Sequence, residues 1–173
     1  MIRSRIEFRV VPITEAHIEG FRAVVDGVAR EHRYLAFLEA PPLPEVREFV
    51  LGNIRGKHPQ FVALVDDLVV GWCDLLPKPR PVFRYTWVLG MGVADGYRGC
   101  GVGTALIATA LETAKERGIT RVELSVRESN RRAIALYEKF GFLREGLMRR
   151  DVFVDGMYEN SLLMAVLFGP EKA

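Results

Sequence analysis

Apolar residues recur along the chain with two different periods. In the first segment Ile6, Phe8 and Val10 occupy every second position, which is typical of a strand, whereas apolar residues between 14 and 30 recur every three or four positions, as in a helix. Two β-rich runs flank Asp66-Asp67 and predict a hairpin. The predicted elements are strand 6–11, helix 14–30, helix 44–56, strands 61–65, 68–73 and 83–93, a helix ending at 117, strand 121–126, helix 130–140, and strands 148–154 and 157–167.

This order of elements predicts the fold class. Strands that come in runs, interrupted by single helices, favour a mixed sheet covered by helices over a doubly wound fold or a helix bundle. We therefore expect an α/β (α+β) protein with a mixed, mostly antiparallel central sheet of about seven strands and about four flanking helices. The length of 173 residues fits one domain, 1–173.

Composition excludes several classes of protein. Apolar residues make up 49% and charged residues 27% of the chain, as in ordinary globular proteins, and the net charge of +2 is too small and too dispersed to indicate nucleic acid. No apolar run approaches the roughly 20 residues that span a bilayer. Cys73 and Cys100 form no CxxC pair, so we expect a reducing, cytoplasmic location. His17, His32 and His58 lack the spacing of metal ligands, and no metal is predicted.

The sharpest motif is a glycine-rich segment at 92–104 that lies between a predicted strand and a predicted helix. The first N–H groups of a helix lack internal partners, and together with the helix dipole they favour an anion. Glycines allow the backbone to approach that anion closely, and Arg98 can add a charge-assisted contact. The segment therefore predicts a cradle for a diphosphate, although an ordinary glycine-rich turn is the competing interpretation.

Spacing argues against two other phosphate-binding loops. A P-loop requires lysine after its last glycine, but Gly103 is followed by Thr104. The dinucleotide fingerprint requires a third glycine at the position of Leu106. A nucleotide-binding module is therefore disfavoured.

Residues 98–103 resemble the GCN5-related N-acetyltransferase (GNAT) family, because Arg-Gly-Cys-Gly-Val-Gly matches its [Q/R]-x-x-G-x-[G/A] pyrophosphate loop. The resemblance implies that acetyl-CoA is the acetyl donor, with its pyrophosphate on this loop and its pantetheine arm along the preceding strand. Cys100 is taken as an incidental loop residue, since no histidine lies near it to activate a thiol. The cofactor-binding residues implied are Met91, Gly92, Val93, Arg98, Gly99, Cys100, Gly101, Val102, Gly103, Thr104, Asn130 and Ala133.

A second segment, 130–142, is similar to the N-x-x-A-x-x-x-Y-x-x-x-G-F pattern of the same family. Ser129 or Asn130 can cap the helix, and the spacing of Asn130, Ala133 and Tyr137 places these three residues on one helix face. The resemblance implies that Tyr137 is the general acid for the leaving thiolate, and a phenol with an ordinary pKa of about 10 is protonated at neutral pH. The alternative is that Tyr137 is a core aromatic residue.

The implied reaction is direct transfer of an acetyl group to a primary amine of a small molecule, an amino acid or a peptide N-terminus. Glu31, Glu39, Asp74 and Glu159 are all possible proton acceptors for the amine, and the sequence does not choose among them. The acceptor pocket is expected from segments 31–43 and 77–85 and from the final hairpin. Its candidate substrate-binding residues are Glu39, Trp87 and Tyr158.

Two further expectations concern other functions and assembly. A non-catalytic CoA-binding sensor or regulatory domain would keep the phosphate loop but would have no use for an acid at Tyr137. The C-terminal hairpin, 148–167, is more apolar than a solvated edge should be, which favours a homodimer. We expect no nucleic-acid partner and no membrane.

Overall fold

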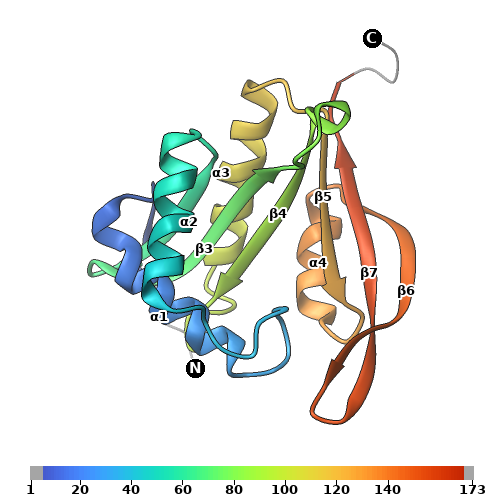
Figure 1. Ribbon diagram of the computed structural model, residues 1–173, viewed down its shortest axis with the longest axis horizontal. Coiled ribbons are helices and arrows are strands. Elements are labelled where there is room, and N and C mark those ends of the chain that lie inside the picture. The colour runs from blue at the N-terminus through green and yellow to red at the C-terminus, as the bar shows by residue number, and fades with distance from the viewer. Residues whose placement is uncertain (1–5, 170–173) are drawn as a thin grey trace.

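The computed structural model describes residues 6–169, which form seven strands and four α-helices (Figure 1). Two single turns of 3-10 helix, Glu15–His17 and Pro81–Phe83, complete the regular structure. The elements are β1 (Arg9–Pro12), α1 (Ile18–Ala29), α2 (Leu43–Arg55), β2 (Gln60–Val65), β3 (Leu68–Pro77), β4 (Thr86–Val93), α3 (Val102–Glu116), β5 (Arg121–Arg127), α4 (Arg131–Lys139), β6 (Leu143–Val154) and β7 (Met157–Leu167).

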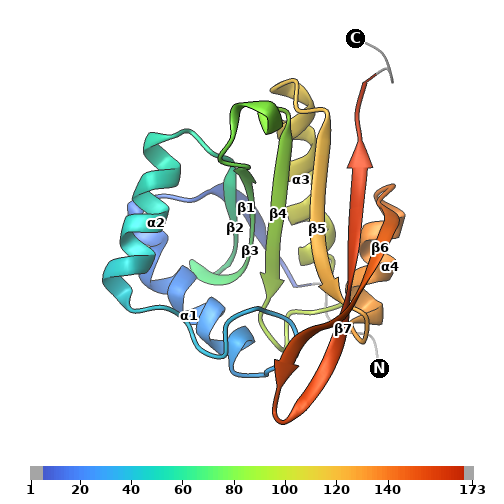
Figure 2. The same ribbon diagram turned by 45° about the vertical axis from the view of Figure 1, so that its right-hand side comes forward.

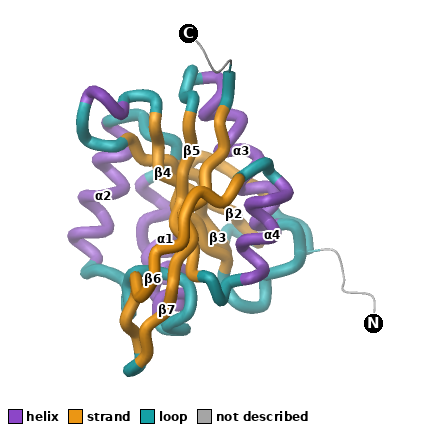
Figure 3. Tube along the Cα trace, turned by 90° about the vertical axis from the view of Figure 1, so that its right-hand side faces the viewer, coloured by secondary structure: helices purple, strands orange, loops and turns teal. Residues whose placement is uncertain are grey.

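The strands form one sheet in the order β1-β2-β3-β4-β5-β7-β6. Every neighbouring pair is antiparallel except β4 and β5, which are parallel and are joined by α3. Helices α1 and α2 cover one face of the sheet, and α3 and α4 cover the other (Figure 3). Two apolar cores, one on each face, follow from this layering. The fold class predicted from the order of elements is confirmed.

Two hairpin turns form as predicted. Asp66 and Asp67 have φ angles of 46° and 65°, and Asp155 and Gly156 have φ angles of 49° and 80°. Two successive residues with positive φ characterise the type I′ turn, whose twist matches that of the strands it joins. Both turns therefore set the register of long antiparallel pairs.

Several element ends differ from the prediction. The strand expected at 83–93 begins at Thr86, because Pro81–Phe83 forms a 3-10 turn, and β3 extends to Pro77 rather than 73. The first strand covers 9–12 instead of 6–11. The last hairpin begins at Leu143 instead of 148, and its pairing is interrupted by two register shifts. Irregular pairing of this kind breaks the two-residue alternation on which the prediction relied.

The parallel pair β4 and β5 is short, and this creates the central feature of the fold. Only Thr86–Val88 pairs with Arg121–Glu123, and beyond that point the two strands diverge (Figures 1 and 2). Unpaired backbone groups of β4 therefore face a gap in the sheet.

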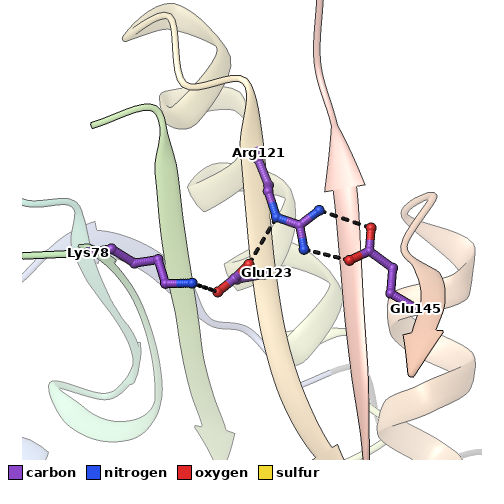
Figure 4. A network of polar contacts seen from close by, with 4 residues as sticks. All are labelled: Lys78, Arg121, Glu123 and Glu145. Atoms are coloured by element: carbon purple, nitrogen blue, oxygen red, sulfur yellow. Dashed lines mark hydrogen bonds and ion pairs between the residues drawn. The ribbon is translucent and has the colours of Figure 1, made fainter. Parts of the chain in front are cut away.

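An ion network holds the closed end of this gap (Figure 4). The Glu123 carboxylate on β5 accepts hydrogen bonds from Lys78 Nζ at 2.5 Å and from Arg121 Nε at 2.9 Å. The Arg121 guanidinium also makes two bonds to Glu145 on β6. Because the network connects residues from the β3 end, β5 and β6, it ties the sheet together at the point where β4 and β5 part.

Candidate functional site

A cavity of about 600 Å³ lies where β4 and β5 diverge. Its walls come from the second half of β4, the glycine-rich loop, the first turn of α3, the start of α4, and the segment between α1 and α2. Residues far apart in the sequence, such as Tyr34, Met91 and Tyr137, thus share one site. The two sequence motifs predicted to act together lie on opposite walls of it.

The glycine-rich loop has the geometry expected of an anion cradle. The residue before α3 is Gly101, with φ of 90°, and no side chain caps the helix. The first N–H groups of α3 therefore have no intrahelical partner and no capping oxygen. Gly99, Gly101, Gly103 and Thr104 all line the cavity, and three of these four positions present bare backbone to it.

Cys100 and Val102 do not line the cavity with their side chains. Cys100 directs its Sγ toward the backbone oxygen of Arg98, at 3.7 Å, and Val102 is buried in the core beneath α3. For these two predicted residues only the backbone is in a position to contact a ligand.

The edge of β4 offers further backbone donors. Ala94 N–H bonds to Val70 on β3 at 2.8 Å, and successive N–H groups of a strand point in opposite directions. The N–H groups of Val93 and Met91 consequently point away from β3 and into the gap. Gly92 lies between them because any Cβ there would overlap the Trp72 ring. The predicted binding edge at Met91, Gly92 and Val93 lines the cavity.

Arg98 has a different role in this structure from the one that its charge suggested. Its Nη1 and Nη2 bond both oxygens of Glu31 at 2.8 and 2.5 Å, and its Nε bonds the Val93 carbonyl at 2.8 Å. The guanidinium also lies over the Tyr34 ring. The hydrogen bonds that Arg98 donates to Glu31 raise the pKa of the Arg98 guanidinium above its usual value. Arg98 lines the cavity and holds the loop against the end of α1.

The second motif forms the opposite wall. Of the two predicted capping candidates it is Asn130 that caps α4, with Oδ1 accepting a hydrogen bond from Ala133 N–H at 3.2 Å. Asn130, Ala133 and Tyr137 all line the cavity. The Tyr137 side chain is 7% exposed, and its ring packs against Phe142 with centroids 5.7 Å apart. Burial, and to a lesser degree Cys73, raises the pKa of Tyr137 above its usual value, so its hydroxyl keeps its proton at neutral pH.

The three predicted substrate-binding residues lie outside this cavity. Glu39 is exposed and pairs with Arg30. Trp87 lies in the paired half of β4, where its Nε1 bonds the Arg84 carbonyl. Tyr158 is exposed on the final hairpin beside Phe153. Segment 77–85 also does not line the cavity, because it precedes β4 and the glycine-rich loop follows β4 (Figure 1).

Segment 31–43 does contribute, through Tyr34, Leu35 and Ala36, and an unpredicted residue holds it in place. Arg127 on β5 is 4% exposed and donates to the backbone oxygens of His32 and Leu35 at 2.7 and 2.8 Å. His32 Nδ1 in turn lies 2.9 Å from Asp155 Oδ1 in the final turn. An arginine at the end of a strand gave no sign of this role, since its partners are backbone atoms about 90 residues away.

Residues 6–169 show neither a metal-binding cluster nor a membrane-spanning helix. No group of three or more His, Cys, Asp or Glu side chains there is arranged to hold a metal ion. None of the helices in that range is long and apolar enough to cross a membrane.

The fold and the cavity together have the form of a transferase that holds a diphosphate-bearing acyl donor between two parted strands. The model of the Acetyltransferase (GNAT) family matches residues 26–142, which is more than half of the chain. The protein belongs to this family, as the two sequence motifs indicated.

Several relatives are acetyltransferases. An L-amino acid N-acetyltransferase of Escherichia coli is 31% identical over 157 residues, covering 90% of this chain and 96% of the relative. An N-alpha-acetyltransferase of Sulfurisphaera tokodaii is 37% identical over 114 residues, covering 61% of this chain and 66% of the relative. A mycothiol acetyltransferase of Thermomonospora curvata is 30% identical over 125 residues, 68% of this chain but only 39% of the relative. The chain thus matches less than two thirds of the length of the last two.

Solved structures share the fold. A ribosomal-protein-alanine N-acetyltransferase of Brucella melitensis has a TM-score of 0.87 at 24% identity, covering 92% of this chain and 99% of that one. An acetyltransferase of Salmonella typhimurium, solved with acetyl-CoA, has a TM-score of 0.90 at 15% identity, covering 96% of each chain. At such identities the likeness concerns the fold.

Proposed function

We propose that this protein transfers the acetyl group of acetyl-CoA to a primary amine, with Tyr137 as general acid. One observation carries the proposal: a single cavity joins the glycine-lined start of α3, the free edge of β4 and the buried Tyr137. Proposed acceptors are an amino acid, a small amine or a peptide N-terminus. The relatives named for amino acids and for protein α-amines support this range.

The residues present fit acetyl-CoA. The uncapped helix start and the three loop glycines suit a diphosphate, which needs N–H donors and close backbone approach. Arg132 lines the same mouth of the cavity and can face further phosphate. The N–H groups of Met91 and Val93 suit the amide and carbonyl oxygens of an extended pantetheine arm. These are the residues that we propose hold the donor.

Each residue has a proposed task in the reaction. When bound, acetyl-CoA supplies an activated acyl group and a thiolate leaving group. The N–H groups on the open edge of β4 are proposed to stabilise negative charge on the carbonyl oxygen. Tyr137 is proposed to hold a proton for the departing sulfur, and its raised pKa keeps that proton in place until sulfur accepts it. Segment 34–36 lines the cavity and is proposed to shield the reacting groups from water when the donor is bound.

A direct experiment tests this function. Thiol release is followed with purified protein, acetyl-CoA and a panel of amino acids, small amines and short peptides with free N-termini. Acetylation of at least one amine, confirmed by mass, is the expected result. Absence of CoA binding by calorimetry at millimolar concentration, with folded protein, would contradict the whole proposal.

The same assay separates the alternative, a non-catalytic CoA-binding sensor. Such a domain would bind CoA but release no thiol with any amine. The buried tyrosine in the cavity wall favours the enzyme, because a sensor has no need for a protonated hydroxyl at that place.

We also propose that the protein forms a homodimer through the outer hairpin. Several apolar side chains of β6 and β7 are exposed, and β6 is the edge strand of the sheet. Exposed apolar residues on an edge strand favour pairing with a second copy. They are Leu143, Leu147, Phe153, Met157 and Leu167.

The two free cysteines, Cys73 and Cys100, support a reducing location, which we propose to be the cytoplasm.

A further inference from the structure

A polar cluster is buried on the face of the sheet that α1 and α2 cover. Asp74 on β3 is paired in register with Gln60 on β2 and with Gly90 on β4. Asn53 of α2 covers the cluster and donates its Nδ2 hydrogen to Gln60 Oε1 at 3.0 Å. The exposed fractions of Asn53, Gln60 and Asp74 are 5%, 3% and 7%. Three polar side chains thus share a site from which water is largely excluded.

Two groups of this cluster lack partners. Gln60 Nε2 is buried and makes no hydrogen bond. Within residues 6–169 the Asp74 carboxyl has no hydrogen bond or ion pair, and burial is the sole influence on its pKa, which it raises to about 7. Buried polar groups are nearly always paired because an unpaired one is costly. A donor and a carboxylate that both lack partners, side by side, point to a ligand that completes them.

Gly90 connects this cluster with the cavity. A Cβ at Gly90 would lie only 2.9 Å from Asp74 Oδ1, so the carboxylate lies directly over a position that has no side chain. Gly90 itself lines the cavity that contains Tyr137. Two residues earlier, on the same face, Val88 is 37% exposed, so solvent reaches this face of β4 next to the buried cluster.

Asp74 and Tyr137 lie on opposite sides of the strands. Cys73 contributes to the pKa of Tyr137, which places that part of β3 beside the tyrosine on the face covered by α3 and α4. Asp74 is the next residue and therefore faces the other way. An acceptor that enters over Gly90 would meet the reactive carbonyl on one side, with the leaving sulfur on the side of Tyr137.

The other candidate proton acceptors are already occupied. Both oxygens of Glu31 are bound by Arg98. Glu39 is exposed and paired with Arg30. Glu159 accepts a hydrogen bond from Ser129 and lies 3.7 Å from Arg127.

From this geometry we infer that Asp74 takes the proton from the acceptor's ammonium group, which approaches the carboxylate over Gly90. The inference rests on the proposed acetyltransferase function. One proton moves from the ammonium nitrogen to a carboxylate oxygen of Asp74, and the nitrogen keeps the lone pair that attacks the carbonyl. Asp74 then passes that proton to water and is ionised again for the next turnover.

The surroundings make Asp74 suited to α-amino groups. The α-amino group at the N-terminus of a peptide has an ordinary pKa of about 8, whereas a lysine amine has one of about 10.4. Transfer to a carboxylate with a pKa of about 7 is therefore unfavourable by roughly tenfold for the first and by more than a thousandfold for the second. We expect peptide N-termini to be acetylated in preference to lysine side chains.

Few charges act on Asp74 from the elements around it. Gln60, Asn53 and Gly90 carry none, and α1 packs on this face with apolar residues. His58 touches the cluster through Asn53, with Nδ1 3.4 Å from Oδ1. The opposite charges of Glu123 and Lys78 balance each other within their ion network. A change in rate near pH 7 that persists in His58→Gln and His32→Gln variants would thus report on Asp74.

The test compares the wild-type protein with Asp74→Asn, which keeps the size of the side chain. With an α-amine acceptor near pH 7, we expect kcat/KM to fall by about 100-fold or more, and the limb of the pH profile near 7 to disappear. An amine with a pKa well below 7, such as an aniline or trifluoroethylamine, arrives without its proton, so its loss should be at most a few-fold. Asp67→Asn, the same change in an exposed turn, is the matched control and should behave as wild type.

Two measurements distinguish a failure of the inference about Asp74 from a failure of the proposed acetyltransferase function. Calorimetry should give unchanged CoA affinity for Asp74→Asn, and a carboxyl carbon NMR titration of the wild-type protein should place the pKa of Asp74 near 7. Equal losses with both kinds of amine, an unchanged pH profile, or an Asp74 that ionises below pH 5 would each overturn the inference. If the wild-type protein binds CoA but acetylates no amine, the proposed function fails instead.

Discussion

Replacing Tyr137 by Phe separates chemistry from folding, because the structure predicts very different magnitudes for the two. The hydroxyl makes no hydrogen bond with residues 6–169, since burial and the nearby Cys73 are the only influences on its pKa. The ring and its contact with Phe142 are retained in the variant. We therefore expect the free energy of unfolding to change by about 0.5 kcal/mol or less.

The effect on the reaction should be much larger. Loss of one general acid lowers kcat by about 10- to 1,000-fold, which corresponds to about 1.4 to 4 kcal/mol of transition-state free energy. Because the pKa of Tyr137 is raised by burial, the wild-type pH profile should show no loss of this acid up to about pH 9.

Thiol release with saturating acetyl-CoA gives kcat, and calorimetry gives the CoA affinity, which should not change. A pre-steady-state burst would show that product release limits the rate, and single-turnover rates would then be compared. If single-turnover rates of the variant and the wild-type protein are equal, Tyr137 is a core aromatic residue and the reasoning is wrong.

Three other predictions address the loop, the sheet and assembly. Gly103→Val should weaken CoA binding at least tenfold with little loss of thermal stability, because a Cβ at Gly103 would meet Leu136 at an ordinary 3.4 Å and point toward Met91. Gly103 is a better test than Gly101, where the same change would also strain a φ of 90°. Unchanged CoA affinity by calorimetry would exclude the loop as the phosphate site. Glu123→Gln should destabilise the protein by about 2 kcal/mol at pH 7, measured by denaturant unfolding. Burial alone would raise the pKa of Glu123, but hydrogen bonds from Lys78 and Arg121 lower it below the usual value of 4.5. The stabilisation from the ionised Glu123 is therefore fully present above pH 4.5 and should vanish as the pH falls through the pKa of Glu123 in the folded protein. A stability difference between variant and wild type that is independent of pH would contradict this. Light scattering at micromolar concentration should give the mass of two chains, and Leu147→Lys on the exposed hairpin should give one; a single-chain mass for the wild-type protein at every concentration would rule out the dimer.

Local patterns in the sequence were sufficient for the order of elements, the positions of the two hairpin turns and the two motifs. These features depend on neighbouring residues: alternation along a strand, successive residues able to adopt positive φ, a glycine before a helix, and an asparagine that caps one. Local reasoning thus narrowed the cap of α4 to Ser129 or Asn130 and predicted a glycine-rich start for α3, and the structure has Asn130 as the cap and Gly101 in the left-handed region.

Tertiary structure alone decided which charged groups are free. Four acidic residues were equivalent candidates in the sequence, and only folding pairs Glu31 with Arg98, exposes Glu39, pairs Glu159 with Ser129 and buries Asp74 without a partner. The divergence of β4 from β5 and the hold of Arg127 on segment 32–35 likewise join residues distant in the chain. The charge state and reach of a side chain depend on its neighbours in space, and periodicity along the chain carries no information about those neighbours.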